Sequence, residues 1–323
     1  MRPVNPDVRA MVDAALKAGV RPLQDSDPQT ARENYLAARR LDQPPLAPVA
    51  SVMDINDGIA PGVSLKIIRG VDTAEPLPCL LYFHGGGWTL GSSQSHEGIC
   101  RSLALAARCC VISVDYRLAP ENPFPAAVDD AIQALRYVVY HAGDLNIDRT
   151  SIALGGDSAG ANLATVLALL GRDGHVPEAV YQLLFYPQVD LRMTASTFDT
   201  AAEGMLVSAA TIRWFVDQYT PNPAARDDWR VSPSLASSLS GLPPAFVLTC
   251  GLDPLGEEGR QYAARLEEEG CAVTALHISD QAHGFLNLGG AIKAASGVLA
   301  YAGFMLSEEW RHTKNRLMQE NTQ

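Results

Sequence analysis

Short apolar runs alternate with amphipathic stretches along most of the chain, beginning near residue 63. Residues 63–68 alternate between apolar and polar side chains, which is typical of a half-exposed strand. The further predicted strands are residues 79–83, 109–114, 152–154, 180–185, 245–249 and 272–278. Those in the middle of the chain are almost continuously apolar, as parallel strands with both faces buried are expected to be.

Helical patterns fall between these strands. They cover residues 96–107, 124–141, 159–170, 257–269 and 290–309. Strand and helix therefore follow each other repeatedly along the chain. This order predicts an α/β fold built on a doubly wound, mostly parallel sheet with helices on both sides.

Two stretches do not follow the alternation. Residues 1–50 carry helical patterns, with a predicted helix start at Asp27 and Pro28, and residues 191–240 separate two strands and hold a helical pattern at 211–219. Since so long an insertion in a compact sheet is usually functional, we expect both stretches to form a cap; two unrelated surface additions are the alternative. The predicted parts are the first part of the cap at 1–50, the core at 51–190, the cap insertion at 191–240 and the rest of the core at 241–323.

The charge balance narrows the choice of partners. The chain has 25 Lys and Arg against 36 Asp and Glu, a net charge of −11, which argues against binding to nucleic acid or to an anionic membrane surface. The longest candidate for a membrane span, residues 161–170, is much shorter than the 18 or so apolar residues that a span needs. Neither class of partner is therefore expected.

The N-terminus and the cysteines predict the compartment. The first 20 residues mix acidic and apolar side chains and lack the continuous apolar core of a signal peptide. The six cysteines lie in or beside apolar runs without a CxxC pair, which favours buried reduced thiols over disulfides or a zinc site. We therefore predict a cytoplasmic protein.

The strongest chemical motif is GDSAG at residues 156–160, which matches GxSxG. The apolar run SIAL precedes it and the helical run ANLATVLALL follows, which is the strand–turn–helix context that an exposed nucleophile requires. Side chains beside so tight a turn would clash, so Gly156 and Gly160 are expected at its flanks. The start of the helix favours negative charge developing near Ser158, the predicted nucleophile.

A second motif, HGGGW at residues 84–88, follows the strand CLLYF directly. Successive glycines leave backbone N–H groups uncovered, so Gly85 and Gly86, with Ala159 after the nucleophile, are predicted to bind a developing oxyanion. A phosphate-binding loop is the rival interpretation, but neither GxxxxGK[ST] nor GxGxxG is present. His84 is expected to shape this loop through a hydrogen bond, and Trp88 and Leu206 are predicted to contact the substrate.

The acid and the base are expected at the same edge of the sheet as the nucleophile. His283 lies just past the last predicted strand, between small residues, and Asp253 follows the strand at 245–249. The chain order Ser158, Asp253, His283 is that of the α/β-hydrolases. Together these residues predict a Ser-His-Asp triad that forms an acyl-enzyme intermediate.

Over about residues 60–310 the chain resembles the bacterial branch of the hormone-sensitive-lipase family of carboxylesterases. The resemblance implies an eight-stranded, mostly parallel sheet with a helical cap, and hydrolysis of short- to medium-chain carboxylic esters without a metal or organic cofactor. It also aligns the predicted triad and oxyanion residues with the family's own and is compatible with a homodimer. The motifs that carry it are HGGGW (84–88), DYRLAPE (115–121), GDSAG (156–160), FYPQVD (185–190), LDPL (252–255) and HGF (283–285).

Some positions carry further expectations. Arg117 and Glu121, within DYRLAPE, are expected to form structural ion pairs. Gly256 stands where the family often has a cation, which we expect to loosen the loop that holds Asp253. The segment 204–207 and the helix that carries Trp214 and Phe215 are expected to line the pocket.

Other functions stay open at this point. The same machinery could cleave an amide, a lactone or a thioester, and a non-catalytic receptor on this fold is a further alternative. Receptors of that kind typically lose the histidine, whereas His283 is present in this chain.

Overall fold

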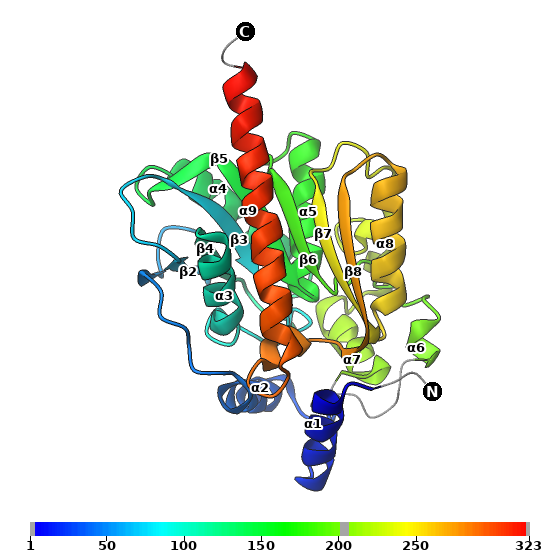
Figure 1. Ribbon diagram of the computed structural model, residues 1–323. Coiled ribbons are helices and arrows are strands. Elements are labelled where there is room, and N and C mark those ends of the chain that lie inside the picture. Colours follow the sequence, from blue (N-terminus) through cyan, green and yellow to red (C-terminus); the bar gives the residue numbers. More distant parts are fainter. Residues whose placement is uncertain (1–3, 201–206, 321–323) are drawn as a thin grey trace.

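A central sheet organises the molecule in the computed structural model, which describes residues 4–200 and 207–320 (Figure 1). Its eight strands lie in the order β1-β2-β4-β3-β5-β6-β7-β8. β1 and β2 are antiparallel to their neighbours, and the pairings from β4 to β8 are parallel. The strands are β1 (Ser51–Ile55), β2 (Ser64–Arg69), β3 (Leu77–Phe83), β4 (Cys110–Asp115), β5 (Ile147–Asp157), β6 (Tyr181–Phe185), β7 (Ala245–Leu252) and β8 (Val273–Ala282).

The predicted mostly parallel α/β sheet is confirmed, and the hydrophobic pattern located every strand except β1. That strand lies at the edge of the sheet, and four of its five residues are exposed. Val52 and Met53, at 38% and 51% exposed, are therefore not part of a buried alternation. An edge strand with little buried surface leaves a weak signal in the sequence.

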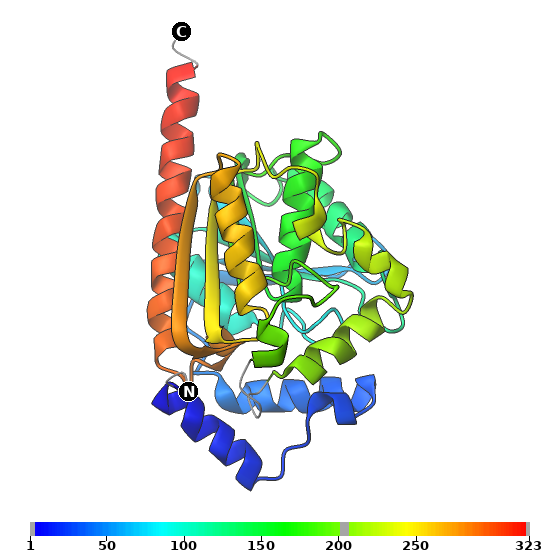
Figure 2. The same cartoon turned by 90° about the vertical axis from the view of Figure 1, so that its right-hand side faces the viewer.

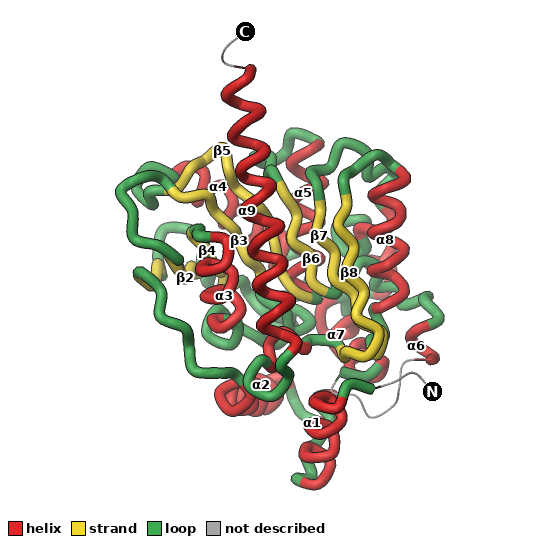
Figure 3. Tube along the Cα trace, in the orientation of Figure 1, coloured by secondary structure: helices red, strands yellow, loops and turns green. Residues whose placement is uncertain are grey.

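Helices cover both faces of the sheet (Figures 2 and 3). Apolar side chains of α4 (Ala126–Tyr140), α5 (Ala159–Arg172) and α8 (Gly256–Glu268) belong to the core on one face. Those of α3 (Glu97–Ala107) and α9 (Ala294–Glu320) belong to the core on the other face. The last turns of α9 extend beyond the sheet (Figure 1).

The remaining helices lie at the edge of the sheet where the parallel strands end (Figures 1 and 2). They are α1 (Pro6–Lys17), α2 (Pro28–Asp42), α6 (Thr197–Thr200) and α7 (Ala209–Tyr219). Asp27 caps α2 as predicted, accepting a hydrogen bond from the N–H of Thr30 at 3.0 Å. Ala31 of α2 and Phe215 of α7 share a small apolar cluster with Leu90. The two segments predicted to form a cap therefore pack against each other.

No helix within the described residues combines the length and the apolar character that crossing a bilayer requires.

Candidate active site

Ser158 lies in the turn between β5 and α5, at the edge of the sheet where the parallel strands end. Its φ of 54° is unusual for a residue with a side chain and reflects the sharpness of the turn. A Cβ at Gly160 would lie 1.9 Å from the Phe83 carbonyl oxygen, and one at Gly156 would lie 2.5 Å from it. The flanking glycines are therefore required by the close approach of β3, and the serine side chain is directed away from the sheet.

Three polar side chains from separate elements meet at this turn. His283 Nε2 lies 2.9 Å from Ser158 Oγ, and His283 Nδ1 lies 2.8 Å from Asp253 Oδ2. Asp253 also accepts a hydrogen bond from the Leu255 N–H at 2.8 Å. All three side chains of the predicted triad are buried or nearly so, with Asp253 only 1% exposed. An aspartate in this position fixes the imidazole with its proton on Nδ1, which leaves Nε2 to accept the serine proton.

Gly256 lies in the loop that holds Asp253. The Gly256 N–H donates to the Asp253 carbonyl at 3.0 Å. A Cβ at position 256 would lie 2.5 Å from the Cys250 carbonyl oxygen, so this backbone leaves no room for a longer side chain. This backbone therefore requires glycine at position 256, and the expectation that Gly256 loosens the loop stays a prediction.

The glycine loop after β3 corrects the predicted oxyanion site. The Gly85 N–H donates to Asp157 Oδ1 at 2.9 Å, so it is already occupied and cannot bind an oxyanion. Within the described residues the N–H groups of Gly86 and Gly87 form no hydrogen bond, and both glycines line the pocket that contains Ser158. Ala159 begins α5, where the first N–H groups have no partner in the helix. Gly87 therefore replaces Gly85 in the predicted set.

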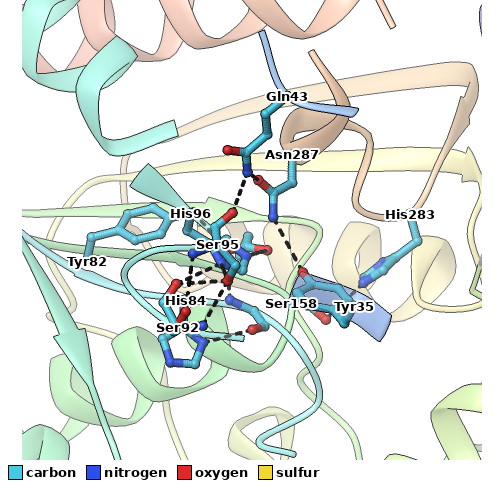
Figure 4. Close-up of polar contacts among 12 residues, drawn as sticks. Tyr35, Gln43, Tyr82, His84, Ser92, Ser95, His96, Ser158, His283 and Asn287 are labelled. Carbon is cyan, nitrogen blue, oxygen red and sulfur yellow. Dashed lines mark hydrogen bonds and ion pairs between the residues drawn. The ribbon is translucent and has the colours of Figure 1, made fainter. Parts of the chain in front are cut away.

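A buried polar cluster beneath the nucleophile fixes this loop (Figure 4). Asp157 accepts hydrogen bonds from Tyr82 Oη at 2.8 Å and from Gly85, and its Oδ2 lies 3.4 Å from His96 Nε2. Burial alone would raise the pKa of Asp157. The contacts with His96, Tyr82 and Gly85 lower it by more than burial raises it, so the net shift is downward. The carboxylate next to the nucleophile thus stays charged and ties the two loops together.

His84 acts on the loop as predicted. Its Nδ1 lies 2.9 Å from the Gly85 carbonyl oxygen, and its ring stacks on Tyr116 with centroids 4.3 Å apart. Burial and the neighbouring His96 lower the pKa of His84 to about 4. It is therefore neutral at physiological pH. Arg117 and Glu121 form the predicted ion pairs, with Asp130 and Arg32 respectively.

The pocket above Ser158 is built by the core and by both predicted cap segments. Leu23, Tyr35 and Arg39 line it from the N-terminal segment, and Val207, Ile212 and Phe215 from the insertion. The lining from the core consists of Gly86, Gly87, Asp157, Ser158, Gln188, His283, Gly284, Asn287 and Leu288. Sequence patterns pointed to Val207 and Phe215 but gave no indication of Tyr35, Arg39, Gln188 or Asn287.

Of the two residues predicted to contact the substrate, the structure describes only Trp88. Trp88 is fully buried and does not line the pocket; its ring stacks on Tyr219 with centroids 4.3 Å apart. Its predicted contact with the substrate is therefore wrong, because the side chain belongs to the hydrophobic core. Leu206 lies outside the described residues. Trp214 packs on the cluster of Ala31, Leu90 and Phe215 without lining the pocket.

Within the described residues no group of three or more His, Cys, Asp or Glu side chains could hold a metal ion.

Residues 80–287 match a protein family described as alpha/beta hydrolase fold. Over 225 residues the chain is 40% identical to carboxylesterase NlhH of Mycobacterium tuberculosis, an alignment that covers 69% of this chain and 70% of that protein. It is 37% identical to an ethyl acetate hydrolase of Pseudomonas putida over 90% of this chain and 95% of the other.

Solved structures are similar to the whole molecule. An esterase from the archaeon Pyrobaculum calidifontis superposes with a TM-score of 0.88 at 33% identity, covering 95% of this chain and 98% of its own. An ester hydrolase from the metagenome of Lake Arreo, solved with a bipyridine phosphonate derivative, gives a TM-score of 0.90 at 36% identity, with 95% and 99% covered.

Proposed function

Because this chain belongs to the hormone-sensitive-lipase family of α/β-hydrolase carboxylesterases, we propose that it hydrolyses short- to medium-chain carboxylic esters with Ser158, His283 and Asp253. One observation carries the proposal: the line of contacts from Asp253 through His283 to Ser158 Oγ, open to a largely apolar pocket. A cytoplasmic location and a homodimer stay predictions.

In the proposed reaction His283 Nε2 takes the proton of Ser158 as Oγ attacks the ester carbonyl carbon. The N–H groups of Gly86, Gly87 and Ala159 stabilise the oxyanion that forms. His283 then gives the proton to the departing alcohol, which leaves an acyl group on Ser158. A water molecule, deprotonated by the same imidazole, attacks the acyl group and releases the acid.

Turnover and covalent labelling test the proposal together. The protein should hydrolyse 4-nitrophenyl butyrate, and a fluorophosphonate should modify Ser158, as located by mass spectrometry of a digest. Labelling of a different residue would contradict the assignment of the nucleophile. A matched set of butyryl amides, lactones and thioesters, compared by kcat/KM, separates an ester hydrolase from the other hydrolases that this machinery permits.

The rate should depend on the protonation of one histidine. The value of kcat/KM for 4-nitrophenyl butyrate should fall as the solution is made more acidic, because a histidine base must be unprotonated to accept the serine proton. Burial and His96 lower the pKa of His84 to about 4, so His84 is neutral near neutral pH. A rate that does not fall in acid, with chemistry limiting, would contradict a histidine base.

Phe215 should limit the length of the acyl chain. Its ring packs on the glycine loop so closely that a Cβ at Gly87 would lie 2.1 Å from it. Replacing Phe215 with leucine or alanine should raise the ratio of kcat/KM for octanoate over butyrate esters about tenfold, since one methylene in a pocket is worth about 1–3 kcal/mol. Leucine is the milder change, because Phe→Ala in a core costs about 3–5 kcal/mol of stability.

Trp214→Ala is the matched control. Trp214 precedes Phe215 on α7 and packs on the same cluster, but it does not line the pocket. Its replacement should leave the chain-length profile in place. Equal shifts in both variants would mean that the insertion acts on stability and not on specificity.

A further inference from the structure

Arg39 places a positive charge without a close counter-charge in the pocket that holds Ser158. It lies on α2 and lines the pocket, and its Nε is buried without a hydrogen-bond partner. Within the described residues no carboxylate lies within ion-pair distance of Arg39. Burial raises the pKa of Asp42, and the charge of Arg39 offsets only part of that rise. On the same helix Arg32, by contrast, is bound to Glu121 at 2.6 Å.

Tyr35, one turn earlier on α2, holds the guanidinium in place. The central carbon of the Arg39 guanidinium lies 4.6 Å from the centroid of the Tyr35 ring. Such stacking orients the planar group and leaves its N–H edges available to a ligand. Tyr35 lines the same pocket, so both side chains face the space in which a substrate must lie.

The hydroxyl of Tyr35 is oriented by a chain of amides (Figure 4). Gln43 Nε2 donates to Asn287 Oδ1 at 2.7 Å, and Asn287 Nδ2 donates to Tyr35 Oη at 3.4 Å. Because the phenol oxygen accepts this bond, its own proton stays available to donate. Arg39 and Tyr35 can therefore both donate hydrogen bonds into the pocket, which is what an anion requires of its partners.

We propose that Arg39 and Tyr35 bind a carboxylate carried by the substrate at a distance from the scissile ester, so that esters with a free carboxylate are preferred. This inference rests on the proposed ester hydrolysis at Ser158. An arginine matches a carboxylate with two parallel hydrogen bonds. A plain fatty acyl chain in the same place would take water away from the guanidinium without giving it a partner, which is unfavourable.

Matched substrate pairs test the proposal. For a carboxylate on the acyl side, the pairs are the monoethyl esters of glutarate, adipate and suberate and their neutral terminal amides. For the alcohol side, they are the acetate esters of glycolate and 4-hydroxybutanoate and the corresponding amides. In each pair the kcat/KM of the acid is divided by that of the amide, and this ratio is corrected for the rates of alkaline hydrolysis.

Arg39→Gln should lower this ratio at least about fivefold in one or more pairs, the size expected for losing a charge-assisted hydrogen bond. Arg39→Lys should retain part of it, because the charge stays while the planar fork is lost. Tyr35→Phe should lower it to a smaller extent. Arg40→Gln is the control: Arg40 is the exposed neighbour on α2, and its replacement should change neither the ratio nor the activity.

A fall of less than fivefold in every pair would overturn the proposal. If Arg39→Gln does not fold, Arg39→Lys and Tyr35→Phe decide, since each should still lower the ratio in the same pairs. An unchanged ratio in both variants would then overturn the proposal. The proposed function fails separately, if the wild-type protein hydrolyses none of the neutral amide-capped esters.

Discussion

Replacing Ser158 with alanine should lower kcat for ester hydrolysis by about 10³-fold or more, because no other group can form the acyl-enzyme. Ser158 Oγ lies 2.9 Å from His283 Nε2, and without it the imidazole has no nucleophile to activate. The backbone strain at this position is the same for alanine as for serine. The fold and the midpoint of thermal unfolding should therefore change little.

Steady-state kinetics with 4-nitrophenyl butyrate, together with a thermal melt, measure both parts of this prediction. Ser296→Ala, a change at an exposed serine of α9, is the matched control and should keep full activity. Retention of more than a few per cent of the wild-type kcat by Ser158→Ala would mean that another residue carries the chemistry.

Asp253→Asn should lower kcat by roughly 10⁴-fold while the protein stays folded. In a Ser-His-Asp triad this change has an effect of that size, because it moves the imidazole proton to the other ring nitrogen. The carboxylate accepts from His283 Nδ1 at 2.8 Å and from the Leu255 N–H. An asparagine has the same size, but its NH₂ group can face Nδ1 only if the imidazole proton moves to Nε2. In that tautomer Nε2 cannot accept the serine proton.

Asp144→Asn is the matched control, because it removes one carboxylate at an exposed position. It should retain the wild-type kcat. Labelling of Asp253→Asn by a fluorophosphonate should be slowed to a similar degree as hydrolysis, because both reactions need an activated Ser158. Normal kcat in Asp253→Asn would remove Asp253 from the proposed triad.

The sequence was most informative where local geometry leaves little choice. A nucleophile between a buried strand and a helix requires glycines at fixed positions, and the contacts of Gly156 and Gly160 with β3 give the reason. The order of the strands along the chain placed Asp253 and His283 at the same edge of the sheet as Ser158. These predictions depend on chain order and strand direction, which hydrophobic patterns record well.

The errors arose where the direction of a single group decides the outcome. Three adjacent glycines look alike in sequence, but in the structure the N–H of Gly85 donates to Asp157 whereas Gly86 and Gly87 line the pocket. Trp88 has a φ of 56°, and its side chain packs on Tyr219 and not toward the substrate. Backbone conformation of this kind has no periodic signature.

The pocket residues of α2 were missed for a different reason. Tyr35 and Arg39 are one turn apart on a helix that is mostly polar. Their place in the pocket depends on how α2 packs across the end of the sheet against α7. That contact joins segments almost 200 residues apart in the chain, so no local window of sequence contains it.

The pocket joins parts of the chain that mutation can alter separately. The family match spans residues 80–287 and contains the proposed triad, whereas Tyr35 and Arg39 lie before it. A substitution in α2 therefore alters the lining of the pocket and leaves the proposed triad in place. Exchanging α2 between this chain and a relative would test whether selectivity for the substrate can change while the reaction stays the same.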